Sequence, residues 1–546
     1  MARTDPDHVK KIKIAYTQRP IAPGAAGSPC SAAHGCSDDF GDLDTGGLCG
    51  REPCGALPFV VPAGVTIEGV PDANGNRPRV TINEIIPDSL SFKNYDWVLP
   101  TGYDFTGRPN ARRPYFIAED GVTIKNLEID GSTYRHKTTL ETVGIFVQDS
   151  VDVTIKNCVV KDLHDGLVFL EKSSEDEGGM ETSAVVEDCE ITDCFPGFDY
   201  APLPAEDEPS NVVFLQDHGH AGIWAEVKHN GVSGPPVELA VVNLVVNSTR
   251  FERNHDAIET DITGGFALTD IQLSTTDCDF ERNENGIEAV SGSGAGGCTI
   301  VVDSCRFQSN YNAPACLGGY QSTSVGTAIP TGAIVHRNKN ANIYVRNSVF
   351  KNNSVAAVLL EAANMIDFGI YDATNPEDIV DSPGNNAFLL DTLPPINGSN
   401  NCMATPVLPY STLDDQPAWV AMLRVDLISS GPQEVHAYGN RWIGSNQFTS
   451  SDGCITAPVV SGCTAPSGFS GPVCGLVNFT LPNACQPLNS SNLRNLSLDN
   501  GVTVFLGPSS YCPPACGTSP VVPPCPADVP APTATAFASC PIPDTP

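Results

Sequence analysis

The sequence is poor in basic residues, with 30 lysines and arginines against 64 aspartates and glutamates and a formal net charge of −34. A negative field of this size repels phosphate backbones, so we expect no nucleic-acid partner; a cation, a glycan or a basic protein surface fits better. Apolar runs are also short, and none reaches the roughly 18 residues of a membrane-spanning helix, so we expect no membrane span.

The opening segment, MARTDPDHVKKIKIAYTQRP, carries positive charge but lacks the apolar stretch of a secretory signal, so no signal peptide is visible. Charged residues make up only 17% of the chain and hydrophobic residues 41%, which excludes a disordered composition and is ample for a core. The 49 glycines and 46 prolines indicate many turns, and stretches that favour helices are few. The composition therefore predicts an all-β protein.

Cysteine is abundant, with 20 residues and no Cys-x-x-Cys pair, which favours disulfides over zinc and an oxidising compartment. Twelve cysteines lie near the two ends of the chain: Cys30, Cys36, Cys49, Cys54, Cys454, Cys463, Cys474, Cys485, Cys512, Cys516, Cys525 and Cys540. We therefore expect an extracellular location or a cell or virion surface. Either a signal lies outside this chain or export follows another route, such as virion assembly.

Asn-x-Ser/Thr sequons are compatible with secretion, although several would arise by chance in a long chain rich in Asn and Ser. The candidate glycosylation sites are Asn247, Asn352, Asn397, Asn478, Asn489 and Asn495.

A short phrase recurs along the chain: VTIEG at 65–69, VTIN at 80–83, and VTIKN at both 122–126 and 153–157. Each copy reads as an alternating β-branched strand followed by a turn residue. A longer phrase, FERNHDAIE at 251–259, returns 29 residues later as FERNENGIE at 280–288. A period near this length predicts a solenoid of stacked coils.

Aligning the copies produces three columns of similar residues. The apolar column holds Val160, Ile191, Phe251, Phe280, Phe307 and Phe350; the small-residue column holds Cys158, Cys189, Thr249, Cys278, Cys305 and Ser348; and the asparagine column holds Asn254, Asn283, Asn310 and Asn353. Stacked coils place each side chain above its predecessor, and asparagine amides can hydrogen-bond along such a stack. We expect three short strands per coil, in parallel sheets.

With these columns, the sequence resembles the right-handed parallel β-helix proteins of the pectate-lyase-like superfamily. The resemblance covers roughly residues 57–363 and extends in outline to the phrase Gly439-Asn440-Arg441-Trp442. It implies a right-handed parallel β-helix, here with disulfide-rich terminal segments. No catalytic family within the superfamily is matched.

The cysteines of the small-residue column would stack about 4.8 Å apart, which is within the Cα range of a disulfide. Stacked side chains point the same way, however, so we expect buried free thiols that pack as small hydrophobic groups.

The chain outside the coils divides by composition. Residues 1–56 read as an N-terminal strand and Cys-rich cap, 57–363 as β-helix coils, 364–447 as inserted loops with the last coil or coils, and 448–546 as a Cys/Pro-rich module and tail. The terminal segments could serve capping, anchoring or self-assembly.

Candidate chemistry lies on the strand that follows the asparagine turn. Its first outward column is expected to read Val168, Asp199, Trp224, Glu259, Glu288, and its second Leu170, Ala201, Glu226, Asp261, Val290. Trp224 could stack on a sugar ring, and paired carboxylates could supply the general acid and the nucleophile or base for glycosidic cleavage. The candidate catalytic residues are thus Glu259, Glu288, Glu226, Asp261 and Asp199.

The expected spacings bear on the mechanism. Glu259 and Glu288, or Glu226 and Asp261, would lie about 5 Å apart, close to retaining geometry; Asp199 and Glu259 would lie about 10 Å apart, at or beyond the inverting range. Calcium is an open alternative at Glu226, Asp261 and Glu259, and no cofactor is certain. The plainest alternative is a solvated acidic face with an incidental tryptophan.

His218 and His220, in the phrase Asp217-His218-Gly219-His220, directly precede the strand of Trp224 and could bind or orient a substrate. The phrase is similar to the Gly-His-Gly of polygalacturonases, but the other motifs of that family are not recognisable. A histidine pair in a loop is more often an incidental surface feature.

We expect an extracellular β-helix protein that binds a polysaccharide along this face, as a glycoside hydrolase or polysaccharide lyase if it is an enzyme. The alternative is a structural or adhesive surface component, such as a filament subunit, spike or envelope protein. The capped solenoid, the disulfide-rich ends and the lack of a complete catalytic motif favour this alternative.

Overall fold

The computed structural model describes residues 11–15, 58–81, 99–106, 112–131, 141–173, 181–194, 221–229, 240–263, 269–283, 285–291, 297–310, 332–336, 341–351, 353, 356–360, 365–370, 384–390, 421–425, 434–436, 440–444, 496–497, 503–505 and 510–512. In these ranges the regular secondary structure is entirely β-strand, which confirms the all-β prediction there. Since none of these residues is helical, they contain no helix able to cross a membrane.

The chain divides into two compact units, residues 1–273 with 291–296 and residues 274–290 with 297–546. We call them the N-terminal unit and the C-terminal unit and describe each by itself. Strand β18 (Thr269–Thr276) runs across the division in sequence.

The N-terminal unit contains three parallel sheets, to which each coil adds one strand. In spatial order, the first sheet holds β1 (Lys11–Ala15), β3 (Thr66–Val70), β6 (Thr123–Lys125), β9 (Val153–Lys156), β12 (Glu181–Glu187) and β15 (Ala240–Asn247). The second holds β4 (Arg79–Thr81), β7 (Glu128–Asp130), β10 (Val159–Lys161), β13 (Glu190–Thr192) and β16 (Arg250–Glu252). The third holds β2 (Phe59–Val61), β5 (Arg112–Ala118), β8 (Glu141–Gln148), β11 (Asp165–Ser173), β14 (Ala221–His229) and β17 (Asp256–Thr263).

The C-terminal unit repeats the plan. Its first sheet holds β21 (Gly297–Asp303), β24 (Ala341–Arg346), β27 (Met365–Asp367), β30 (Glu434–His436), β33 (Thr503–Phe505) and β32 (Leu496–Ser497), the last pair antiparallel. The second holds β19 (Asp279–Glu281), β22 (Arg306–Gln308), β25 (Val349–Lys351), β28 (Ala387–Leu390), β31 (Arg441–Gly444) and β34 (Ser510–Cys512). The third holds β20 (Asn285–Ser291), β23 (Gly332–His336), β26 (Ala356–Leu360) and β29 (Ala421–Val425).

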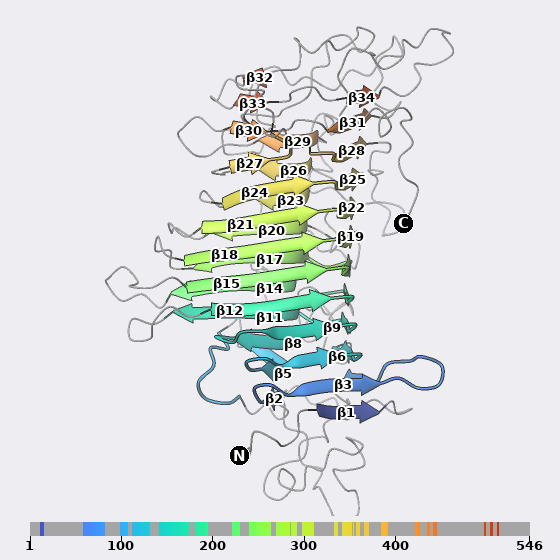
Figure 1. Cartoon of the computed structure of the whole chain (residues 1–546), viewed down its shortest axis with the longest axis vertical. Helices are drawn as coiled ribbons and strands as arrows, with labels where there is room; N and C mark the ends of the chain where they lie inside the picture. Colours follow the sequence, from blue (N-terminus) through green and yellow to red (C-terminus); the bar gives the residue numbers. More distant parts are fainter. Residues whose placement is uncertain are drawn as a thin grey trace, which may run out of the picture. The chain divides into compact units, whose positions relative to one another are not determined.

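The strand register follows the repeated phrases. Thr66 pairs with Thr123 and Thr123 pairs with Thr154, so the VTI phrases stack in successive coils of the first sheet. Figure 1 shows these strands as successive rungs, from β1 in blue to β15 in green. Three parallel sheets fed in turn by each coil are the arrangement of a β-helix, which agrees with the predicted solenoid.

A left-handed residue forms the bend between the first and second sheets. Asn126, Asn157 and Asp188 have φ of 61°, 51° and 53°, and Asn347 has 52° at the same bend in the C-terminal unit. Asn and Asp tolerate this conformation better than other residues with a side chain, so their place at these bends has a local cause; Ser248 and Ser304 hold the same bend in two other coils.

The apolar column forms the core of the second sheet. Val160 pairs with Ile191 and Ile191 with Phe251 in the N-terminal unit. In the C-terminal unit, the Phe280 and Phe307 rings stack with centroids 4.5 Å apart and planes 2° from parallel, and the stack continues through Phe350 to Phe388. Each ring is buried, and burial of a Phe side chain stabilises the fold by about 1.5–3 kcal/mol.

The asparagine column is an interior hydrogen-bond ladder. Asn310 Oδ1 accepts from the backbone N–H and side-chain Nδ2 of Asn283, at 3.1 and 3.0 Å. Asn310 Nδ2 in turn donates to Asn353 Oδ1 at 2.9 Å and lies 2.9 Å from the Phe280 carbonyl. The predicted ladder is therefore confirmed for these asparagines.

The cysteines of the small-residue column are buried free thiols, as expected: Cys158, Cys189, Cys278 and Cys305. Their sulfurs lie 3.2–3.4 Å from carbonyls two residues earlier in the chain, so each thiol has a local acceptor. The side chains of the twelve terminal cysteines, and with them the predicted terminal disulfides, lie outside the described residues.

Candidate functional site

The third sheet of the N-terminal unit carries most of the predicted stripe. Trp224 on β14 pairs with Val168 on β11 and with Glu259 on β17, while Glu226 pairs with Leu170 and Asp261. These four pairings agree with the predicted columns for β11, β14 and β17.

One expected coil is missing from these columns. Because β14 pairs directly with β11, no strand lies between them, and the rung predicted for Phe198 to Ala201 is wrong. Asp199 itself lies outside the described residues, as do His218 and His220. The alignment failed because Leu167 and Ile223, which pair on neighbouring rungs, lie 56 residues apart in sequence, almost twice the 29-residue period.

The predicted exposure of the stripe is also wrong. Trp224 is 3% exposed, Glu226 5%, Glu259 6% and Asp261 4%, although all four point away from the solenoid interior. The outer face of this sheet is therefore covered, and neither an open sugar-stacking surface nor a solvated acidic face describes it.

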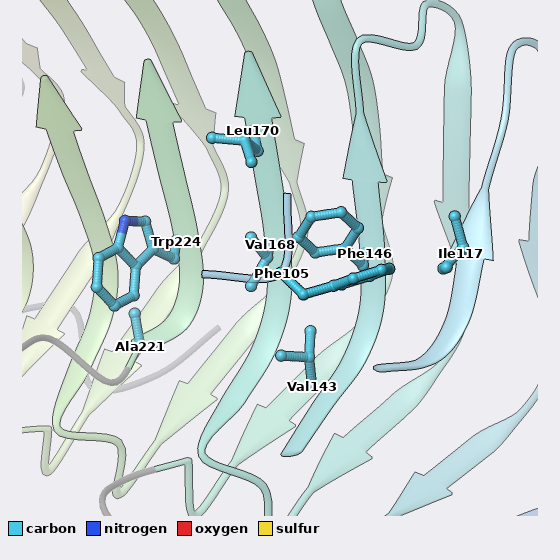
Figure 2. Packing of buried hydrophobic residues seen from close by; sticks show 8 residues of the cluster. All are labelled: Phe105, Ile117, Val143, Phe146, Val168, Leu170, Ala221 and Trp224. Carbon is cyan, nitrogen blue, oxygen red and sulfur yellow. The ribbon is translucent and has the colours of Figure 1, made fainter. Parts of the chain in front are cut away.

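Residues 99–106, which we call the strap, supply part of the cover. Phe105 belongs to one hydrophobic cluster with Phe146, Val168 and Trp224, and its ring centroid lies 5.2 Å from that of Phe146. Figure 2 shows Phe105 beside Phe146 and Val168, with Trp224 on the next strand. Leu99 and Tyr103 of the strap pack against the same cluster.

Polar contacts fasten the strap to the sheet. The Asp104 N–H donates to Gln148 Oε1 at 2.6 Å, and the Arg112 N–H donates to the Phe105 carbonyl at 2.7 Å. The Tyr103 hydroxyl donates to Glu119 Oε1 at 3.2 Å, and burial together with the Glu119 charge raises the pKa of Tyr103 to about 12.

Asp104 also lies between two lysines. Lys172 and Lys228 face each other in the register of β11 and β14, and their Nζ atoms lie 3.6 and 3.2 Å from Asp104 Oδ2. Although burial opposes ionisation, hydrogen bonds from Thr106 and the charge of Lys228 lower the pKa of Asp104 to about 2. The single negative charge of Asp104 thus offsets the repulsion between the two lysines.

Arg112 is a central residue of the site that the sequence analysis missed. Its Nη1 and Nη2 both lie 3.2 Å from Glu226 Oε2, and its guanidinium carbon lies 4.7 Å from the centroid of a Trp224 ring. Arg112 is 2% exposed, so this ion pair and cation–π contact are buried. No local motif marks Arg112, because Glu226 and Trp224 lie more than a hundred residues further along the chain.

The charge of Arg112 is held by several carboxylates. Burial opposes the charged form, but the charges of Glu226, Asp165 and Glu141 outweigh it and raise the pKa of Arg112. Glu226 is therefore an ion-pair partner in this structure.

A hydroxyl links Glu226 to the next coil. Thr263 Oγ1 lies 3.5 Å from Glu226 Oε1 and 3.2 Å from Asp261 Oδ2, within hydrogen-bond distance of both carboxylates. The two acids thus share one donor on neighbouring rungs, which lie about 4.8 Å apart.

Two further observations concern this face. Among the described residues, no group of three or more His, Cys, Asp or Glu side chains is arranged to hold a metal ion, so the calcium alternative at Glu226, Asp261 and Glu259 gains no support. Trp224 Nε1 is buried and finds no hydrogen-bond acceptor within the described part of the chain.

Glu288 belongs to the C-terminal unit. It is 5% exposed, pairs with Val335 of β23, and accepts from Asn285 Nδ2 at 2.8 Å. Its side chain therefore has a structural partner on its own strand.

A histidine–aspartate pair at the start of β17 also escaped the sequence analysis. His255 Nδ1 lies 2.8 Å from Asp256 Oδ2; the Asp256 side chain is 1% exposed and that of His255 18%. The signal was available, since both residues stand in the repeated phrase where the later copy has Glu284 and Asn285.

Two arginines next to the asparagine column, Arg253 and Arg282, form salt bridges at left-handed turn positions. Arg253 has φ of 56° and binds Asp193 through Nε and Nη2 at 2.9 and 2.7 Å. Arg282 has φ of 58° and lies 3.3 Å from Glu281.

Of the predicted glycosylation sites, Asn247 ends β15 with a half-buried side chain. Asn352, Asn397, Asn478, Asn489 and Asn495 lie outside the described residues.

A buried carboxyl lies on the other side of the same sheet. Glu171 is fully buried, and its Oε2 accepts from Thr182 Oγ1 at 3.0 Å. Burial raises the pKa of Glu171 to about 8, with a further contribution from the Asp149 charge. This side chain is therefore largely protonated at neutral pH.

Comparison of the chain with protein-family models, with curated proteins and with solved structures finds no match to any of them.

Proposed function

We propose that the protein is a non-catalytic structural or adhesive component of an extracellular, cell or virion surface, built on a right-handed β-helix of the pectate-lyase-like type. The observation that carries this proposal is the burial of the acidic and aromatic stripe. Trp224, Glu226, Glu259 and Asp261 are each at most 6% exposed.

The bonding of these side chains supports the same proposal. Glu226 neutralises Arg112, Asp261 shares the Thr263 hydroxyl with Glu226, and the Trp224 ring packs against the Arg112 guanidinium. A general acid or nucleophile must reach its substrate, and a sugar-stacking ring must present a face to it. Groups engaged in this way stabilise a scaffold.

The interior contacts that repeat from coil to coil also support this proposal. Stacked phenylalanines and the asparagine ladder repeat the same contacts from coil to coil, so that stability adds up along the solenoid. Stacked coils in a chain of high negative charge suit a filament, spike or envelope element. In this proposal the terminal segments support self-assembly.

A second candidate is a glycoside hydrolase or polysaccharide lyase, which the pairing of Trp224 with Glu259 and of Glu226 with Asp261 favours. For Glu226 and Asp261, the rung spacing is near the roughly 5 Å between the carboxylates of retaining enzymes. For this candidate the strap has to leave the outer face before a glycan can bind.

One experiment separates the two candidates. The full chain is assayed for binding and cleavage against a panel of acidic and neutral glycans, beside Glu259→Gln, Glu288→Gln and the control Glu187→Gln, which changes a more exposed carboxylate paired with Lys156. The structural proposal expects no cleavage, and ordered assemblies by electron microscopy. Cleavage that is lost in Glu259→Gln or Glu288→Gln but kept in Glu187→Gln would overturn it in favour of the enzyme.

A further inference from the structure

The strap covers a face that is not simply apolar. The Trp224 indole belongs to the same cluster as Phe105, and its N–H has no acceptor among the described residues. Arg112 packs on the Trp224 ring and forms the buried ion pair with Glu226. Buried polar groups that lack partners are uncommon in folded proteins, and each one opposes the closed arrangement. Water that reached this face would supply a hydrogen-bond acceptor for the Trp224 N–H.

Two kinds of contact stabilise the closed strap against this cost. Phe105 adds an apolar ring to Phe146 and Val168, and Asp104 lies between Lys172 and Lys228. The lysine side chains are 33% and 18% exposed, so this latch is within reach of solvent ions. Thr101 and Gly102, at the turn of the strap, are exposed.

We propose that residues 99–106 form a two-state strap, latched by Asp104 on Lys172 and Lys228, whose release exposes Trp224 and the Arg112–Glu226 pair. The closed state gains apolar burial and the latch. The open state gains hydration of the indole N–H and of the buried ion pair, and leaves Lys172 and Lys228 facing each other without Asp104. Because the latch is ionic and partly exposed, salt and local charge control the equilibrium.

This proposal stands independently of either candidate function. If the protein is a scaffold, the strap controls access to a buried surface patch; if it is an enzyme, the strap controls access to the carboxylates. Failure of the glycan assay leaves the strap proposal intact, because the test below uses no substrate.

The test uses Trp224 as its own reporter. In a full-length Trp97→Phe, Trp419→Phe, Trp442→Phe variant, Trp224 is the remaining tryptophan, and acrylamide quenching of its fluorescence measures its exposure to solvent. Asp104→Asn is expected to raise the quenching constant severalfold. The control Asp152→Asn makes the same charge change at an exposed residue and is expected to leave quenching unchanged.

Hydrogen exchange distinguishes strap opening from loss of the fold. The strap proposal expects Asp104→Asn to accelerate exchange at the Asp104 and Arg112 amides while the strand amides of β8, β11 and β14 stay protected. Acceleration throughout those strands would overturn it, because residues 99–106 would then be an inseparable part of the core.

Salt provides the same test without a mutation. About 1 M NaCl shortens the Debye length to about 3 Å. It should therefore raise Trp224 quenching in the single-tryptophan variant that keeps Asp104. In the same variant with Asp104→Asn, salt should have little further effect. Equal shielding of Trp224 in the parent at low and high salt and in Asp104→Asn would refute the strap.

Discussion

Arg112 and Glu226 form a buried ion pair on the outer face of the third sheet, with both guanidinium Nη atoms 3.2 Å from Glu226 Oε2. The pair joins β5 to β14, two strands that are not neighbours in the sheet. Glu226, a candidate catalytic residue by sequence, therefore forms a structural contact.

Arg112→Met is therefore expected to be strongly destabilising. It leaves Glu226, Asp165 and Glu141 without the cation that faces them, and removal of one partner from a buried pair costs about 3–5 kcal/mol. The free energy of unfolding from urea titration measures the effect. The double variant Arg112→Met, Glu226→Leu should recover part of the loss; a double variant less stable than Arg112→Met would contradict the pairing.

The raised pKa of Glu171 predicts that its contribution to the free energy of unfolding falls as pH rises. Its folded pKa of about 8 lies above its ordinary 4.5, so its contribution is fully present below about 4.5 and is lost as pH rises through about 8. Between these values the wild type should lose up to about 1.4 kcal/mol per pH unit relative to Glu171→Gln, in which the group does not titrate.

Unfolding of both proteins followed from pH 5 to pH 9 tests this difference, with Glu187→Gln as a carboxylate control on the outer side of β12. Parallel stability curves for the wild type and Glu171→Gln would show that Glu171 ionises normally in the fold.

Asn310→Ala should interrupt the interior ladder. It removes the acceptor of Asn283 and the donor to Asn353 at once, and each buried group left unsatisfied costs about 1–3 kcal/mol. Asn243→Ala, at an outward and half-buried position of β15, should change the unfolding free energy by less than about 0.5 kcal/mol. Similar losses in both variants would mean that the ladder contributes little.

The thiols of Cys158 and Cys189 should resist alkylation in the native protein and react only on unfolding. They are 0% and 4% exposed and pack between successive coils as free thiols. Peptide mapping after alkylation with and without denaturant reports each thiol separately. A Cys158–Cys189 disulfide, or fast native alkylation of either residue, would contradict this prediction.

The sequence by itself determined the solenoid. The VTI phrases, the Asn, Asp or Ser after the strands, the phenylalanine column and the asparagine column are local, periodic signals that the strand register and hydrogen bonds match. A solenoid is predictable in this way because each coil mainly contacts its neighbours. One period of the sequence therefore includes most of the interactions that stabilise a coil.

Only the tertiary structure decided the state of the candidate site. Alternation correctly placed Trp224, Glu226, Glu259 and Asp261 on the outer face, but outward does not mean exposed. The strap lies between coil strands, and Arg112 begins the coil strand β5 outside the repeated phrases, so neither has a period that could reveal what it contacts. Residues that break a repeat find their partners through long-range packing and charge pairing, which the spacing of a sequence does not encode.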